Sequence, residues 1–101
     1  MTGAFKTADA ASGLLAPGSV AVGSVKSNVG HLLAAAGVAG ALKAMLALER
    51  RELPPTINFA RRNPHIDLAG TPFAINSELK PWPGTAGGPR RAAVNAFGFS
   101  G

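Results

Sequence analysis

Residues 23–50 carry the sequence GSVKSNVGHLLAAAGVAGALKAMLALER. From about His31 to Arg50 this stretch is rich in Ala and Leu, which are among the strongest helix formers. Pro54 and Pro55 follow shortly afterwards and forbid a continuation of the helix. The stretch therefore predicts one long helix, around which we place the rest of the chain.

The predicted helix is apolar on nearly every side, with a single interior charge at Lys43. It is too short and too interrupted by this charge to span a membrane. A helix that is apolar all round otherwise lies in a protein core. Gly37 and Gly40 each cost about 1 kcal/mol relative to Ala in a helix interior, and close approach of another backbone would compensate for that cost. We therefore expect a central buried helix in a packed α/β layer.

Both ends of this helix carry recognisable signals. Ser27 or Asn28 is expected to cap the N-terminus with a side-chain oxygen. Arg50 and Arg51 suit the negative end of the helix dipole. The helix is thus expected to begin soon after these polar residues and to end at the arginine pair.

Three further segments predict strands. Ser19–Val25 alternates small and branched apolar residues, which is typical of a short buried strand. Phe73–Leu79 alternates apolar and polar positions, and Arg91–Phe97 follows after a loop rich in proline and glycine, so the two could pair antiparallel. The predicted fold class is α/β, with the central helix packed on a mixed sheet and a C-terminal antiparallel strand pair.

The composition of the 101 residues fits one globular domain or a slice of a larger one, with 47% apolar and 15% charged residues. The chain has no Cys, which excludes disulfides, thiolate metal sites and a thiol nucleophile within it. The formal charge is +5, but the basic residues are scattered singly and in pairs. This pattern argues against nucleic-acid binding, and a mild basic excess fits an acidic protein partner equally well. No signal peptide is recognised, so a cytoplasmic protein without a membrane segment is expected.

The sequence argues against two catalytic motifs and one metal site. Lys26 and Ser27 are placed like the end of a phosphate-binding loop, but that loop requires Gly before the Lys, and Val25 occupies the place. Residues 98–101 lack the Gly-x-Ser-x-Gly spacing and the following helix of a nucleophile elbow. His65 is interpreted as a turn or surface histidine because no second ligand stands at metal-binding spacing. No metal site is expected.

His31 is the strongest candidate for chemistry. It is predicted to lie at the first turn of the long helix, directly after a strand, with Lys26 five residues earlier. The partial positive charge of a helix N-terminus disfavours an imidazolium there. A neutral imidazole donates an N–H to a developing oxyanion, as an electrophile rather than a base. Lys26 could stabilise the same negative charge.

Several motifs together resemble the β-ketoacyl synthases, the condensing domains of polyketide and fatty-acid synthases. The stretch from Gly23 to Gly40 is similar to the second histidine motif of that family, in the form found in bacterial modular type I polyketide synthases. The resemblance covers residues 19–101 in order. It continues through the following segments: Leu53-Pro54-Pro55-Thr56, Asn63-Pro64-His65-Ile66-Asp67, Pro81-Trp82-Pro83 and Asn95-Ala96-Phe97-Gly98-Phe99-Ser100-Gly101.

The resemblance implies a partial thiolase-like fold, namely most of its second α/β half. The family condenses an acyl thioester with a malonyl-type extender through a Cys–His–His set. Carried over here, His31 is the second histidine, Lys26 the lysine that supports the histidine pair, and Phe99 the gating phenylalanine whose backbone N–H helps form the oxyanion hole. The substrates arrive on the phosphopantetheine of an acyl carrier protein, and no cofactor is bound directly. The intact family enzyme is a homodimer.

The resemblance also indicates what this chain lacks. The family's cysteine and first histidine would lie upstream of Met1, and His65 is not that first histidine. Residues 1–101 are therefore expected to be the C-terminal part of a β-ketoacyl synthase domain, truncated at both ends and inactive without its N-terminal half. One alternative is a non-catalytic remnant or interaction fragment of the same fold, and another is a decarboxylating or chain-length partner that never carries the cysteine.

Overall fold

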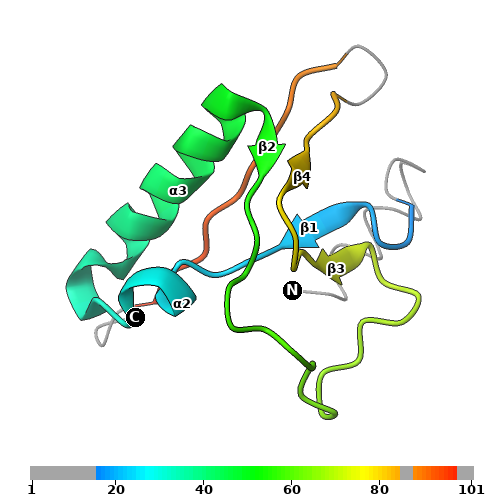
Figure 1. The fold of residues 1–101 in the computed structure, drawn as a ribbon, viewed down its shortest axis with the longest axis horizontal. Helices are drawn as coiled ribbons and strands as arrows, with labels where there is room; N and C mark the ends of the chain where they lie inside the picture. Colours follow the sequence, from blue (N-terminus) through cyan, green and yellow to red (C-terminus); the bar gives the residue numbers. More distant parts are fainter. Residues whose placement is uncertain (1–15, 85–87, 98–101) are drawn as a thin grey trace.

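The computed structural model describes residues 16–84 and 88–97. Its elements follow in the order β1 (Val20–Val22), α2 (Lys26–Val29), the 3₁₀ turn η1 (Leu33–Ala35), α3 (Ala36–Arg50), β2 (Glu52–Leu53), β3 (Phe73–Ile75) and β4 (Lys80–Pro81). Helix α3 stands along one side of the molecule, and the short strands lie across from it (Figure 1). This content agrees with the predicted α/β class.

Helix α3 ends as predicted and begins later than predicted. At its C-terminus Arg51 adopts a left-handed conformation, and its N–H donates to the Ala47 carbonyl. The expected start at His31 is wrong, because the backbone takes a positive φ of 76° at Gly30 and one of 51° at Leu33. These two residues interrupt the helical hydrogen bonds, so the chain forms α2 and η1 before α3.

The predicted N-terminal caps are also wrong for α3. Ser27 and Asn28 lie within α2, and Ala35 precedes α3 without any side-chain cap. Neither polar side chain satisfies an N–H of the long helix. The η1 turn instead leads directly into α3, with the Ala36 N–H bonded to the Leu33 carbonyl.

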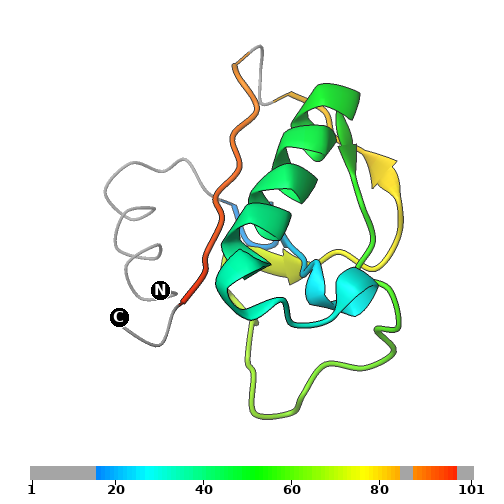
Figure 2. The same cartoon turned by 90° about the vertical axis from the view of Figure 1, so that its left-hand side faces the viewer.

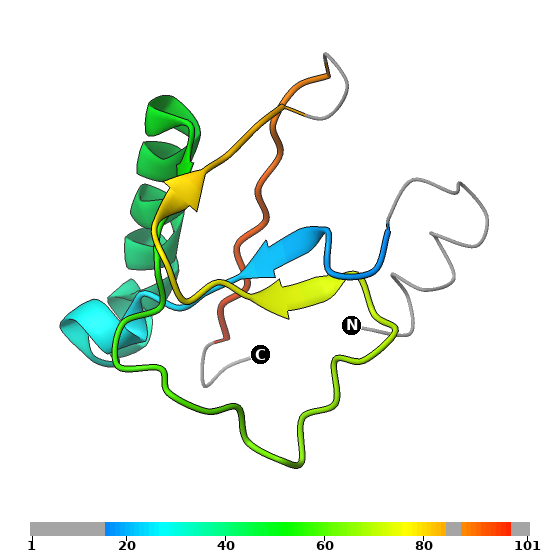
Figure 3. The same cartoon turned by 45° about the vertical axis from the view of Figure 1, so that its right-hand side comes forward.

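Strand pairing differs from the prediction. β3 pairs with β1 in parallel, with Val20 opposite Phe73 and Val22 opposite Ile75, and the two lie side by side in Figure 3. β2 pairs antiparallel with β4. We expected residues 73–79 to pair antiparallel with residues 91–97. This expectation is wrong, because residues 88–97 form no strand.

Residues 88–97 run along α3 instead (Figure 2). A Cβ atom placed on Gly37 would lie 3.3 Å from the Cβ of Ala96, and one placed on Gly40 would lie 3.1 Å from Cγ1 of Val94. Both distances are tighter than ordinary contacts between side chains. A close approach at these two glycines is present as expected, but the atoms that approach belong to the side chains of Ala96 and Val94 and not to a backbone.

Helix α3 was predicted to be buried, and this prediction is wrong. No residue of α3 is buried, and Pro72 is the only apolar residue among the described ones that is buried. Val38 and Met45, each 64% exposed, and Leu42, 54% exposed, form an open apolar face. The physical reason is that two sheets of two short strands offer too little surface to cover a helix that is apolar all round. Within the described residues, no helix is long and apolar enough to cross a membrane.

Asn76 joins the two sheets. It is 5% exposed, and its side-chain amide donates to the carbonyls of Leu53 (3.1 Å) and Pro54 (2.7 Å). Its backbone N–H donates to the Val22 carbonyl at 3.0 Å, and its own carbonyl accepts from the Thr56 N–H at 2.8 Å. One buried residue thus ties the end of β1 to the segment that leaves β2.

Candidate functional site: the turn between β1 and α3

His31 lies on the turn between α2 and η1, five residues before α3 begins. The prediction that it occupies the first turn of the long helix is wrong, and the helix dipole of α3 therefore does not act on it directly. Its ring is exposed, and Nδ1 accepts a hydrogen bond from the Leu33 backbone N–H at 3.1 Å. With Nδ1 acting as an acceptor, the neutral ring carries its hydrogen on Nε2. The Nε2–H therefore remains as the donor that can act on a ligand.

Lys26 is the first residue of α2, the short helix that precedes the turn with His31. Its backbone N–H donates to Oγ of Ser24 at 3.2 Å. Its carbonyl accepts from the N–H of Gly30 at 2.8 Å, which ties Lys26 to the residue just before His31. Within the described residues its ammonium has no hydrogen bond or ion pair. The structure thus brings two of the three predicted site residues onto one short hydrogen-bonded segment.

In the sequence Lys43 stands out only as the one charge inside an apolar helix. In the structure it links α3 to α2 and to the residues just before α2. Its Nζ donates to the Ser24 carbonyl at 3.1 Å and to Oδ1 of Asn28 at 3.2 Å. Burial lowers the pKa of the Lys43 ammonium from its ordinary value, because the charged form loses solvation. No role was predicted for Lys43 from the sequence, although a charge on an otherwise apolar helix needs polar partners and this signal could have indicated one.

A groove of about 610 Å³ opens between α2 and the exposed face of α3. Leu32, the residue directly after His31, contributes to its wall, and Lys43 is one of its four polar lining residues, with Asn28, Arg50 and Glu52. The lining residues are Val25, Asn28, Val29, Leu32, Ala39, Leu42, Lys43, Leu46, Ala47, Arg50, Glu52, Pro54 and Leu79. The candidate turn is thus bordered by a mostly apolar surface.

The other expectations have mixed outcomes. Phe99 falls outside the described residues, so its predicted gating role stays a prediction. His65 lies in a turn, where its backbone N–H donates to Oδ1 of Asn63 at 2.9 Å, as predicted. Across residues 16–84 and 88–97 there is no group of three or more His, Asp or Glu side chains that could hold a metal ion.

Comparison with known proteins places this turn in a family. The sequence model of the β-ketoacyl synthase C-terminal domain matches residues 4–60. One component of the phenolphthiocerol/phthiocerol polyketide synthase of Mycobacterium tuberculosis is 54% identical over 81 residues, which is 80% of this chain and 5% of that protein. Polyketide synthase PksL of Bacillus subtilis is 52% identical over 81 residues, which is 80% of this chain and 2% of that protein.

Solved structures agree with the sequence comparison. The ketosynthase from module 6 of the bacillaene synthase of Bacillus subtilis 168 superimposes with a TM-score of 0.66 at 50% identity, covering 69% of this chain and 13% of that one. Ketosynthase twelve of the bacillaene polyketide synthase of Bacillus amyloliquefaciens gives a TM-score of 0.61 at 46% identity, covering 64% and 12%. The predicted partial thiolase-like α/β fold is confirmed.

The chain spans a small part of its relatives, about one eighth of the solved ketosynthases and one twentieth or less of the polyketide synthases. The family match nevertheless includes the whole of β1, α2, η1 and α3, and hence Lys26, His31 and Lys43. The chain therefore belongs to the family of β-ketoacyl synthase C-terminal domains.

Proposed function

We propose that this chain supplies the second histidine and its supporting lysine to a condensing enzyme of polyketide synthesis. The reaction is the decarboxylative Claisen condensation of an acyl thioester with a malonyl-type extender held on an acyl carrier protein. His31 is the electrophilic donor, Lys26 a positive charge near it, and Phe99 the backbone contributor to the oxyanion hole. Residues 1–101 act as the C-terminal part of a larger condensing domain, which forms a homodimer.

The observation that carries this proposal is the hydrogen bond from the Leu33 N–H to Nδ1 of His31, 3.1 Å long. It leaves Nε2–H as the group presented to a ligand. A ring held in this tautomer donates but does not accept at Nε2, which suits an electrophile and not a general base.

The proposed role follows from the electron balance of the decarboxylation. When the bond between the extender's α-carbon and its carboxylate breaks, carbon dioxide leaves and the electron pair is delocalised onto the thioester oxygen. A donor at Nε2 stabilises that oxygen more in the transition state than in the ground state. The resulting carbanion attacks the carbonyl carbon of the acyl group, and a thiolate leaves as the new carbon–carbon bond forms.

The acyl group must be held by a nucleophile outside this chain, because the chain has no Cys. We therefore expect the chain alone to form no acyl-enzyme when it is incubated with acyl-carrier-protein thioesters. Intact mass measures this directly. A stoichiometric acyl adduct on any of its residues would contradict this part of the proposal.

The decisive experiment places the matching segment of this chain into the Bacillus subtilis module 6 ketosynthase, which is 50% identical over the shared part. Carbon dioxide release and acyl-cysteine formation are then measured for His31→Ala, His31→Asn and His31→Gln. Losing one preorganised donor typically costs about 10²–10³ in rate, so the Ala variant should lose most decarboxylation and keep acyl transfer. The Asn and Gln variants, which still donate, should recover part of the loss.

His65→Ala is the matched control, because it removes an exposed turn histidine outside the candidate site. It should leave both measurements unchanged. Equal failure of the three His31 variants would argue for a general base. Normal carbon dioxide release by His31→Ala would remove His31 from the mechanism.

A further inference from the structure

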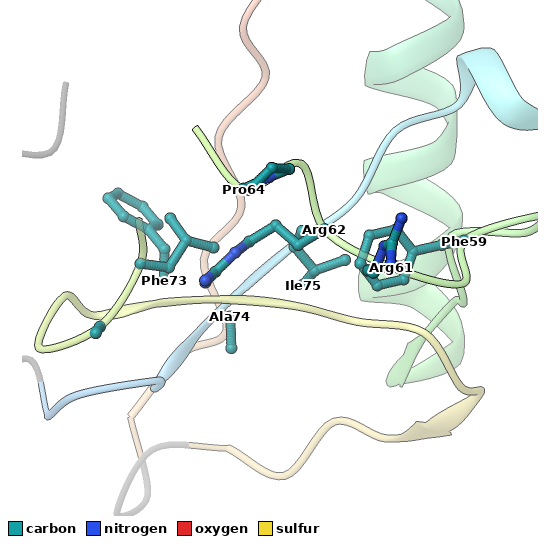
Figure 4. Close-up of a pocket in the computed structure, with 9 residues that line it drawn as sticks. Phe59, Arg61, Arg62, Pro64, Phe73, Ala74 and Ile75 are labelled. Atoms are coloured by element: carbon teal, nitrogen blue, oxygen red, sulfur yellow. The ribbon is translucent and has the colours of Figure 1, made fainter. Parts of the chain in front are cut away.

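A second hollow, of about 540 Å³, lies between β3 and the loop that precedes it. Its apolar part includes Phe59, Leu68, Phe73 and Ile75, and its cationic part is the pair Arg61 and Arg62 (Figure 4). None of its lining residues contributes to the groove beside His31. It is therefore a separate feature of the surface, and the condensation chemistry proposed above makes no use of it.

The arginine pair is placed on a loop that carries its own hydrogen bonds. The Ile66 N–H donates to the Asn63 carbonyl at 3.0 Å, and Oδ1 of Asp67 accepts from the Ala69 N–H at 2.9 Å. At the end of the loop, the buried Thr71 bonds the Leu68 carbonyl through its hydroxyl at 2.7 Å and its N–H at 3.1 Å. These contacts shape the loop before any partner binds, which lowers the ordering cost of binding.

The described part of the hollow carries an unbalanced charge. Among residues 16–84 and 88–97, no carboxylate lines it, and neither arginine has an ion pair or a hydrogen bond to another of these residues. Asp67, the acidic residue nearest to the pair in sequence, directs one oxygen to the Ala69 N–H instead. In Figure 4 the Arg62 side chain extends over the strand toward Phe73. The planar guanidinium of an arginine can bind a carboxylate through two parallel N–H donors.

The hollow is open to solvent. Arg61, Arg62 and Pro64 at its edge are exposed, and Phe59, Phe73 and Ile75 are half-buried. A pocket for a small ligand usually encloses most of the ligand's surface. This hollow has an exposed edge and would leave much of a small ligand in solvent. A protein segment, by contrast, covers such a surface with an apolar anchor at the centre and polar contacts around it.

We propose that this hollow docks an acidic peptide segment of a partner protein. The segment places an apolar side chain against Phe59, Phe73 and Ile75, and its carboxylates bind Arg61 and Arg62. The formal charge of +5 on the whole chain favours the approach of such a partner.

The test uses the full chain and a fluorescein-labelled acidic peptide in which leucine and phenylalanine alternate with aspartate and glutamate. Fluorescence anisotropy should show binding that weakens about tenfold or more when Arg61→Gln and Arg62→Gln are combined. The matched control combines Arg50→Gln with Arg51→Gln, an arginine pair at the end of α3, and should change the affinity far less. Replacing both apolar residues of the peptide by serine should also weaken binding.

Amide chemical shifts of the unmodified chain provide a second measurement, which does not depend on any variant. The peptide should perturb Phe59, Phe73 and Ile75 before any residue of the groove beside His31. Equal loss of affinity in the two arginine variants would mean that only net charge attracts the peptide, and the proposal would be wrong. It would equally be overturned if anionic phosphatidylserine vesicles or inorganic phosphate bound through Arg61 and Arg62 while the peptide did not.

Discussion

Lys43→Met tests whether a single ammonium holds the turn that carries His31. The substitution keeps most of the side-chain length and the helix propensity, but it removes the hydrogen bonds to the Ser24 carbonyl and to Oδ1 of Asn28. A typical hydrogen bond contributes about 0.5–1.5 kcal/mol net. Methionine also relieves the desolvation that lowers the pKa of the ammonium. We therefore expect a loss of about 1–2 kcal/mol, confined to the contact between α2 and α3.

Native-state amide exchange measures this loss at the affected residues. The N–H groups of Asn28 and Val29 donate to the Val25 carbonyl, and that of Gly30 donates to the Lys26 carbonyl. A loss of about 1–2 kcal/mol corresponds to roughly 5–30-fold faster exchange at these amides. The interior amides of α3 should change much less.

Lys80→Met is the control for this experiment, since it removes the same charge from an exposed residue of β4. It should leave exchange in α2 unchanged. The reasoning fails if Lys43→Met does not accelerate exchange at the α2 amides. It also fails if every amide accelerates to the same extent, because the lysine would then act on global stability and not on the turn.

Two further predictions concern how other segments are attached. Gly40→Val should displace residues 94–96 from α3, because even a lone Cβ at this position lies 3.1 Å from Cγ1 of Val94; faster amide exchange at residues 94–96 would report the displacement, and unchanged exchange there would contradict it. Asn76→Ala should cost about 1–3 kcal/mol, because it leaves two carbonyls without their buried amide donor. Urea unfolding measures this loss, for which Ser77→Ala at the exposed neighbouring position is the control; equal midpoints for the two variants would show that Asn76 does not hold the sheets together.

The sequence predicted those features that depend on local chemistry. The end of α3 at Arg50 follows from the helix formers before it and the prolines after it. Gly37 and Gly40 indicated the close approach of another segment without identifying it. Each of these inferences needed only residues that are neighbours in sequence or one helical turn apart.

Features that depend on distant residues were missed. The helix start was predicted too early because the positive φ at Leu33 leaves no signature in propensity, and Gly30, a residue type that favours positive φ, was not recognised as a break. The partner of β3 was wrong because alternation predicts that a strand exists and not which strand it pairs with. Lys43 was recognised as an isolated charge, but its two acceptors lie 15 and 19 residues away in sequence, beyond the reach of any local pattern.

The parallel pairing of β1 with β3 has a consequence for how the chain is made. Val20 meets Phe73 only after roughly fifty intervening residues have been synthesised, and closing a loop of this length delays contact formation more than forming a helix does. During synthesis β1 emerges before β3, and its edge toward β3 stays unpaired, while α3 can form at once from local contacts. A nascent chain that pauses before Phe73 thus presents an open strand edge beside an uncovered apolar helix, and this is the interval in which a ribosome-associated chaperone would have the most to protect.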